Sequence, residues 1–214
     1  APRVSAGALN AGFQPGLELP PEGVRRSLRR SSRGFRPGDV DEDGPMERLR
    51  RAGFDLTDWR DFRGEWTREP FDRAGFIAGL VAHVHELADL SKSPSYAGDN
   101  LFVDTEPVRR LSRDLTRMPP PESDEALDEL ESLLVELRKN RDVKRARKGS
   151  GPTYAKGVTR AQVLDARDRL MAALDDFVLR ADADLSALLH DELLGCVDMY
   201  EELKAREGGL DFLD

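Results

Sequence analysis

Residues 160–207 read RAQVLDARDRLMAALDDFVLRADADLSALLHDELLGCVDMYEELKARE, and this stretch decides the fold. It contains no proline and a single glycine, and its apolar residues recur every three or four positions. That spacing predicts one amphipathic α-helix. Thr159 and Gln162 can form a capping box at its start, and Gly208 with Gly209 can end it. The predicted helix therefore covers about 159–207.

Such a helix is unusually long. At about 1.5 Å per residue it would span roughly 70 Å, which exceeds the diameter of a compact domain. Shorter helices must therefore pack along it, or part of it must project as an arm. The apolar spacing slips near Asp184, which argues against a regular coiled coil.

The remainder of the chain also favours helices. Charged residues make up 35% of the 214 residues and aromatic residues only 7%, which is typical of solvated helices rather than of a β-sandwich or barrel. Residues 1–44 are rich in glycine and proline and are predicted to be irregular, apart from a short helix near 23–30. In residues 45–140, periodic segments predict shorter helices at 45–52, 71–90, 106–118 and 123–140, with a short turn at 58–62. The predicted fold class is all-α, a single helical bundle organised along the C-terminal helix.

Residues 141–158 are predicted to be a basic loop that contains glycine. The segment 138–157 reads RKNRDVKRARKGSGPTYAKG, with Lys and Arg dominating before the glycines begin. Its cations can neutralise phosphates without reading base sequence, or they can be a solvated helix end that suits the helix dipole. The glycines favour nucleic acid, because they can bring backbone near a polyanion. The candidate DNA-contacting residues are Arg138, Lys139, Arg141, Lys144, Arg145, Arg147, Lys148, Tyr154 and Lys156.

A second basic cluster, VRRSLRRSSRGFR at 24–36, is predicted to be surface charge paired with nearby acids. The net charge of −8 excludes a uniformly basic DNA-coating protein but leaves room for a local basic patch. No apolar run approaches the roughly 20 residues of a membrane span, and no signal-peptide pattern opens the sequence. The single Cys196 cannot form an internal disulfide, which fits a reducing compartment. We therefore expect a cytoplasmic protein.

The sequence predicts no catalytic residue and no metal site. His83 and His85 lie two residues apart and so point to different faces of a helix, and His190 belongs to no metal-binding motif. Cys196 has apolar neighbours and is predicted to be a buried structural thiol. The stretch GSGPTYAKG at 149–157 lacks the GxxxxGK[ST] order of a phosphate-binding loop, so ATP binding is not expected within this chain.

The end of the chain, YEELKAREGGLDFLD, resembles the segment that closes the helical insertion in the first RecA-like lobe of UvrD/Rep-type DNA helicases. The residues that carry this resemblance are Tyr200, Lys204, Gly208, Gly209, Leu210, Asp211, Phe212 and Asp214. Further stretches are similar to the same insertion in the AddA/RecB branch of helicase-nucleases, and they lie at 24–30, 58–73, 148–160 and 180–193. Together the resemblance covers most of residues 20–214.

The resemblance implies a non-catalytic, DNA-contacting and scaffolding subdomain, often called 1B, of an ATP-dependent DNA helicase in repair or recombination. Residues 159–214 would then form the long helix and its return to the motor. The nucleotide-binding P-loop would precede this chain and the acidic Mg²⁺-binding strand would follow it. ATP and Mg²⁺ would thus belong to the parent protein, with no cofactor in this chain. The start at Ala1 and the end at Asp214 fit an excised segment.

The implied partners are single-stranded DNA and fork duplex, the rest of the helicase chain, and a nuclease or helicase subunit of the same complex. Two other functions remain open at this point. The long helix could present a face to a partner protein without touching DNA. Alternatively, His83, His190 and neighbouring acids could serve a hydrolytic enzyme.

Overall fold

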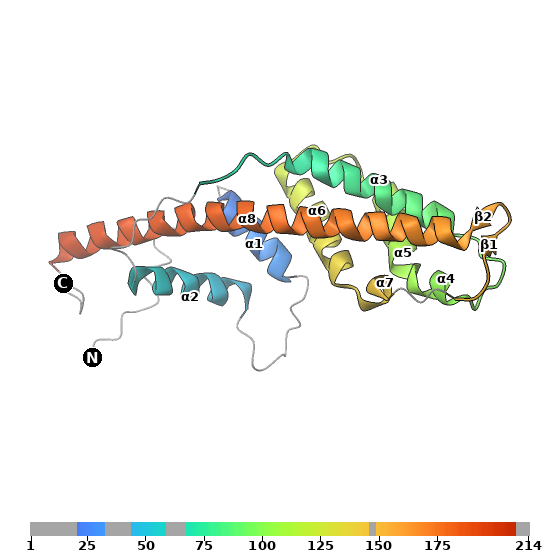
Figure 1. Cartoon of the computed structure of the whole chain (residues 1–214). Helices are drawn as coiled ribbons and strands as arrows, with labels where there is room; N and C mark the ends of the chain where they lie inside the picture. Colours follow the sequence, from blue (N-terminus) through green and yellow to red (C-terminus); the bar gives the residue numbers. More distant parts are fainter. Residues whose placement is uncertain (1–20, 33–43, 59–66, 146–148, 209–214) are drawn as a thin grey trace.

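The computed structural model describes residues 21–32, 44–58, 67–145 and 149–208, and it is almost entirely helical (Figure 1). Predictions for the turn at 58–62 and for residues 209–214 lie outside these ranges, except for Asp58. In chain order the described elements are α1 (Glu22–Ser32), α2 (Pro45–Asp58), α3 (Arg73–Ser91), α4 (Asn100–Asp104), α5 (Glu106–Arg117), α6 (Asp124–Lys139), α7 (Arg141–Lys144), β1 (Thr153–Ala155), β2 (Val158–Thr159) and α8 (Arg160–Glu207). The predicted all-α class is confirmed.

Helix α8 is the axis of the molecule, as the sequence predicts. At its start the Thr159 hydroxyl accepts the backbone N–H of Gln162, whose side chain accepts the N–H of Thr159 in return. At its end Gly208 adopts φ 65°, in the left-handed region, and donates its N–H to the carbonyl of Lys204. A residue with a Cβ is strained at that φ, so glycine suits the end of this helix.

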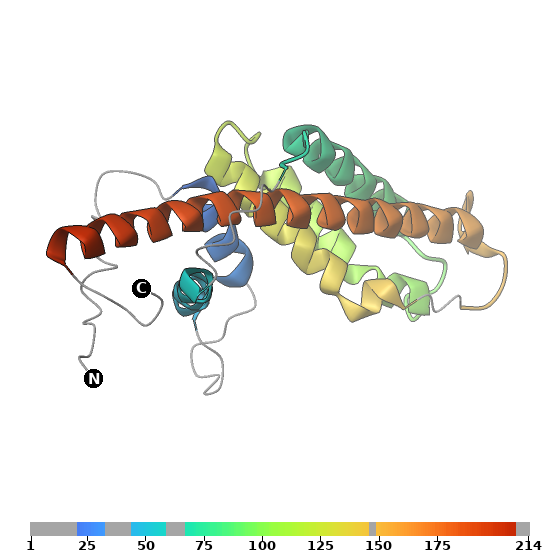
Figure 2. The same ribbon diagram turned by 60° about the vertical axis from the view of Figure 1, so that its left-hand side comes forward.

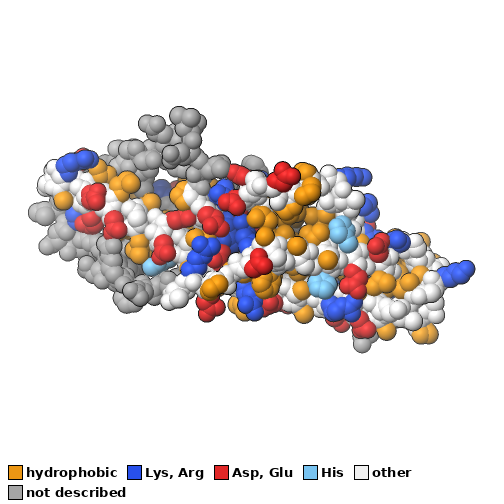
Figure 3. All heavy atoms as spheres, turned by 90° about the horizontal axis from the view of Figure 1, so that it is seen from above, with side chains coloured by type: hydrophobic (Ala, Val, Ile, Leu, Met, Phe, Trp, Pro, Cys, Tyr) orange, Lys and Arg blue, Asp and Glu red, His pale blue; other side chains and the backbone are white. Residues whose placement is uncertain are grey.

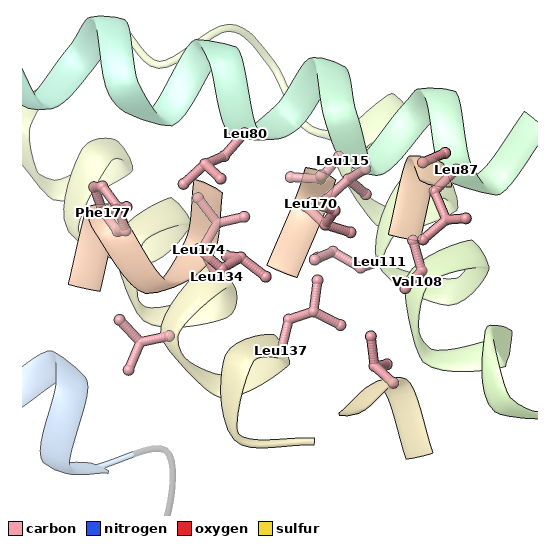
Figure 4. Packing of buried hydrophobic residues seen from close by; sticks show 14 of the residues in the cluster. Leu80, Leu87, Val108, Leu111, Leu115, Leu134, Leu137, Leu170, Leu174 and Phe177 are labelled. Atoms are coloured by element: carbon pink, nitrogen blue, oxygen red, sulfur yellow. The ribbon is translucent and has the colours of Figure 1, made fainter. Parts of the chain in front are cut away.

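The first half of α8 forms a bundle with α3, α5 and α6, which surround it on one side (Figures 1 and 2). The core of this bundle is largely aliphatic: leucines of the four helices point toward one another, and Phe177 lies at one end of the cluster (Figure 4). Leu170, Leu174 and Phe177 on α8 are fully buried. Burying a side chain of this size contributes about 1.5–3 kcal/mol relative to leaving it exposed, so this stripe fixes α8 in the bundle.

The second half of α8 extends past the bundle, where α1 and α2 pack against it (Figures 1 and 2). The two halves of α8 meet at Asp184, where the apolar spacing of the sequence slips. Asp184 is buried and keeps the inward position of the apolar stripe, between Ala181 and Leu185. The apolar spacing slips because a charged residue takes a buried position, and α8 continues through it without a break.

Two local predictions need correction, and one short helix is additional. Helix α2 continues to Asp58 instead of ending near Ala52, and α4 is an additional short helix that the sequence analysis did not predict. Residues 141–158 are more than a loop, because they contain α7 and an antiparallel pairing of β1 with β2. Asn140 explains why α7 forms: its side chain accepts the N–H groups of Asp142 and Val143 and so begins a new helix.

Candidate nucleic-acid interface

The predicted basic segment lies at one end of the bundle, around the end of α6, α7 and the β1–β2 hairpin (Figure 1). Val143, on α7, is fully buried in the aliphatic core and anchors the segment there. Around this anchor the cations face outward: Lys139, Arg141, Lys144 and Arg145 are all exposed. Arg147 and Lys148 lie outside the described residues.

One candidate of this group has an acidic partner. Arg138 donates from Nε to Asp175 on α8 at 2.8 Å, and both side chains are partly exposed. Among the described residues, no carboxylate forms an ion pair with Lys139, Arg141, Lys144 or Arg145. Their charge is therefore available to an external anion.

Tyr154 was expected to offer its ring to DNA, and this expectation is wrong. The side chain is 1% exposed, and its hydroxyl donates to the carbonyl of Ser91 at the end of α3 at 2.8 Å. The backbone N–H of Ser95 in turn donates to the carbonyl of Tyr154 at 2.8 Å. Burial raises the pKa of Tyr154 to about 12. The residue attaches the hairpin to α3 and has no ring face free for a base.

The hairpin is held from its other side by Arg160, the first residue of α8. Its guanidinium makes two hydrogen bonds to the carboxylate of Asp99, at 3.0 and 2.5 Å. It also donates to the carbonyls of Gly151 at 3.0 Å and Ser150 at 3.2 Å, so it organises the glycine-containing loop. The hydrogen bond from Arg160 outweighs the effect of burial and holds the pKa of Asp99 below its ordinary value.

Lys156 stands at the tip of this fixed hairpin. It is exposed, and it lies between the strands next to Gly157, whose φ of 79° makes the tight turn. Figure 3 shows basic side chains at the same end of the molecule, on the right. The hairpin thus carries one exposed cation at the same end of the bundle as α7.

The second basic cluster, on α1, behaves differently. As predicted, its described arginines are paired with acids. The pairs of Arg29 with Glu129 and of Arg30 with Asp182 lie at the surface, but other pairs lie inside the fold. Arg26 is 1% exposed and contacts Asp184 at 2.6 Å and Glu131 at 3.2 Å. Burial alone would raise the pKa of Asp184, but hydrogen bonds from Arg68 and Arg26 outweigh it and lower that pKa.

Two neighbours complete this buried network. Arg73 donates to Glu131 at 2.6 Å and to Asp128 at 2.7 Å, and the Nε of Arg25 lies 2.6 Å from Asp128. Arginine is suited to such positions because its planar fork satisfies two carboxylates at once. The network joins α1, α3, α6 and α8, so these cations hold the fold together and are unavailable to DNA.

In the ranges that the structure describes, no three His, Cys, Asp or Glu side chains gather as a metal ion would require. The Nδ1 of His85 lies 2.8 Å from the Ser112 hydroxyl, and the Nδ1 of His83 lies 3.6 Å from Glu86, which are packing and surface contacts. Cys196 was predicted to be buried but is exposed, because it lies on the outward side of α8 one residue before the buried Val197. None of the described helices combines the length and apolar character that crossing a bilayer requires.

Tyr96 is an exposed aromatic residue at the basic end that the sequence pattern does not single out. This residue lies in the loop between α3 and α4, directly after Ser95, which hydrogen-bonds to the hairpin. Its side chain is 72% exposed. A tyrosine in the polar stretch KSPSYAGDN signals exposure, but nothing local indicates that the fold brings it to the basic end.

No family model, curated protein or solved structure matches this chain. The function that the residues support must therefore be inferred from the geometry of the basic end and from the sequence resemblance.

Proposed function

We propose that this chain is a non-catalytic, DNA-contacting and scaffolding unit of an ATP-dependent DNA helicase of the UvrD/Rep type, nearest to the AddA/RecB branch. The observation that carries the proposal is a contrast between two basic clusters. Arg25 and Arg26 of α1 are paired with buried acids, whereas the cations around α7 and the hairpin are exposed and mostly lack acidic partners among the described residues. Cations that the fold does not use are the ones available for phosphate.

The proposed contact is with the phosphate backbone and reads no sequence. Lys139, Arg141, Lys144 and Arg145 are long cations on or beside a surface helix, and Lys156 adds a cation from the hairpin. Point charges of this kind attract phosphates at any base sequence and release counterions when they bind. The affinity should therefore fall steeply as salt is added.

The scaffolding part of the proposal rests on α8. This single helix of 48 residues runs from the basic end to the opposite end of the molecule. It could therefore transmit the position of bound DNA to whatever adjoins its C-terminal end, which is the motor in the helicase interpretation. The motor would supply ATP, Mg²⁺ and catalysis, and the complex, together with any nuclease or helicase subunit, would work in the cytoplasm in DNA repair or recombination.

The test is fluorescence anisotropy of labelled forked DNA at several salt concentrations. The variant Lys144→Ala/Arg145→Ala should bind more weakly and should lower the log–log salt slope by about 2, one for each lost phosphate contact. The matched control, Arg180→Ala/Arg206→Ala, removes two exposed cations from α8 away from the basic end and should leave the slope unchanged. If both variants bind like the original chain, the basic end makes no DNA contact and the proposal fails.

A second candidate function is a protein-interaction scaffold that does not touch DNA. It is favoured by exposed apolar side chains at the other end of the molecule, where Met199 and Tyr200 on α8 are 54% and 40% exposed and Met46 on α2 is 58% exposed. Affinity capture would test it: the purified chain is the bait, and the candidates are subunits of the proposed helicase complex that have been treated with nuclease to remove DNA. Capture that is lost on changing Met199 and Tyr200 to Ser, with DNA affinity unaffected, would support this function.

A further inference from the structure

The loop 92–99 places an exposed aromatic ring at the basic end of the bundle. The Tyr96 side chain is 72% exposed, and Lys92 at the start of the same loop is exposed as well. Single exposed apolar residues are common on protein surfaces and need no function. The position of this one, on a backbone that is attached to the hairpin, is what sets it apart.

The backbone on both sides of Tyr96 is fixed. On one side the N–H of Ser95 donates to the carbonyl of Tyr154 in β1 at 2.8 Å. On the other side the N–H of Asp99 donates to the carbonyl of Tyr96 at 3.0 Å, and Asp99 is itself held by two hydrogen bonds from Arg160. The loop therefore presents the ring from a frame that is attached to the hairpin and to α8.

The ring itself lies against the backbone of Gly98. A Cβ on Gly98 would come within 2.7 Å of the Cε1, Cζ and hydroxyl atoms of Tyr96, so only glycine lets the ring take this position. One side of the ring is thus supported, while most of its surface stays open to solvent.

A supported aromatic ring beside exposed cations is the combination that proteins use for single-stranded nucleic acid, because the cations attract the backbone and the ring stacks on an unpaired base. In a duplex the bases are already stacked on one another, so the ring gains nothing from them. Tyr154, the ring expected from the sequence, is buried beneath the same hairpin. We infer that Tyr96 is a stacking platform for an unpaired base of single-stranded DNA, an inference that rests on the DNA contact proposed above.

The experiment compares an oligo(dT) single strand with a blunt duplex of equal length, by fluorescence anisotropy with the full chain. Tyr96→Ala should weaken binding of the single strand by about 5- to 150-fold, the effect measured for one base stacked on an aromatic residue, and should leave duplex binding unchanged. Tyr96→Phe keeps the ring and should bind like the original chain. Tyr200→Ala, at the opposite end of the molecule, is the matched control.

The results separate this inference from the proposed function. If Lys144→Ala/Arg145→Ala weakens both DNA forms and Tyr96→Ala weakens neither, the basic contact stands and the stacking platform is overturned. An equal loss for both forms with Tyr96→Ala also overturns stacking, because a base-stacking ring must distinguish them. If Lys144→Ala/Arg145→Ala has no effect on either form, the proposed DNA contact itself fails.

Discussion

Arg26 offers the sharpest test of how the two halves of the molecule are joined. Its side chain is fully buried between Glu131 of α6 and Asp184 of α8, at 3.2 and 2.6 Å. Replacing it with Met keeps much of the volume but leaves two buried carboxylates short of a cation. Removing one partner of a buried ion pair costs about 3–5 kcal/mol, because a charge remains in a poorly solvated place.

The remaining contacts place Arg26→Met at the lower end of that range. Glu131 keeps Arg73 at 2.6 Å, and Asp184 keeps Arg68 at 2.6 Å. We therefore expect a loss of about 3 kcal/mol, a large share of the roughly 5–15 kcal/mol by which a domain is stable. The matched control is Arg138→Met, which breaks the exposed pair with Asp175 and should cost about 0–1 kcal/mol.

The measurement is urea unfolding followed by circular dichroism. With a slope of about 2–3 kcal/mol per molar urea, Arg26→Met should lower the midpoint by about 1–1.5 M, while Arg138→Met should lower it only slightly. Equal midpoints for Arg26→Met and Arg138→Met would refute the claim that the α1 arginines hold the fold together.

Four further predictions follow from the same contacts. Burial raises the pKa of Tyr154 to about 12 in the folded chain. The unfolded chain therefore loses the phenolic proton at lower pH, and the stability of the fold should decrease between about pH 10 and 12. Tyr154→Phe should remove this alkaline dependence. Because the pKa of Asp184 is lowered in the fold, its contribution is present at neutral pH and should be lost as the pH falls below about 4, and Asp184→Asn should flatten the acid limb of the stability curve. Thr159→Ala removes the capping hydroxyl of α8 and should cost about 1 kcal/mol in urea unfolding. Exposed Cys196 should react with a thiol reagent in the folded chain as fast as in urea.

The helices could largely be predicted from sequence because their signals are local. The capping box at Thr159, the periodic leucines and the closing Gly208 all lie within a few residues of the boundary that they set. The predicted span of α8 matches the observed helix for that reason. The hairpin was missed because its strands are two and three residues long and owe their place to Tyr154, whose partner Ser91 is 63 residues away.

The candidate site was harder to predict, because the sequence does not show which cations are already paired. The clusters at 24–36 and 138–156 have similar compositions, yet the partners of Arg25 and Arg26 lie 103 to 158 residues away in the chain. The exposed ring at Tyr96 is missed for the same reason, since Ser95 in its loop is 59 residues from Tyr154, the strand residue that fixes the loop. Local composition predicted a basic surface, and only tertiary contacts distinguish the exposed cluster from the buried one.

A signal for the buried cluster was nevertheless present in the sequence. Asp128 and Glu131 follow Leu127 and Leu130 on the inward side of α6, and Asp184 occupies an inward position on α8. A carboxylate in the apolar stripe of a helix cannot stay unpaired, because burying an isolated charge costs far more than a fold can supply. Acids in such stripes therefore predict inward arginines elsewhere in the chain, and α1 is the arginine-rich helix that supplies several of them. Once the arginines paired in this way are set aside, the segment around α7 is left as the basic cluster whose charge is available to an external anion.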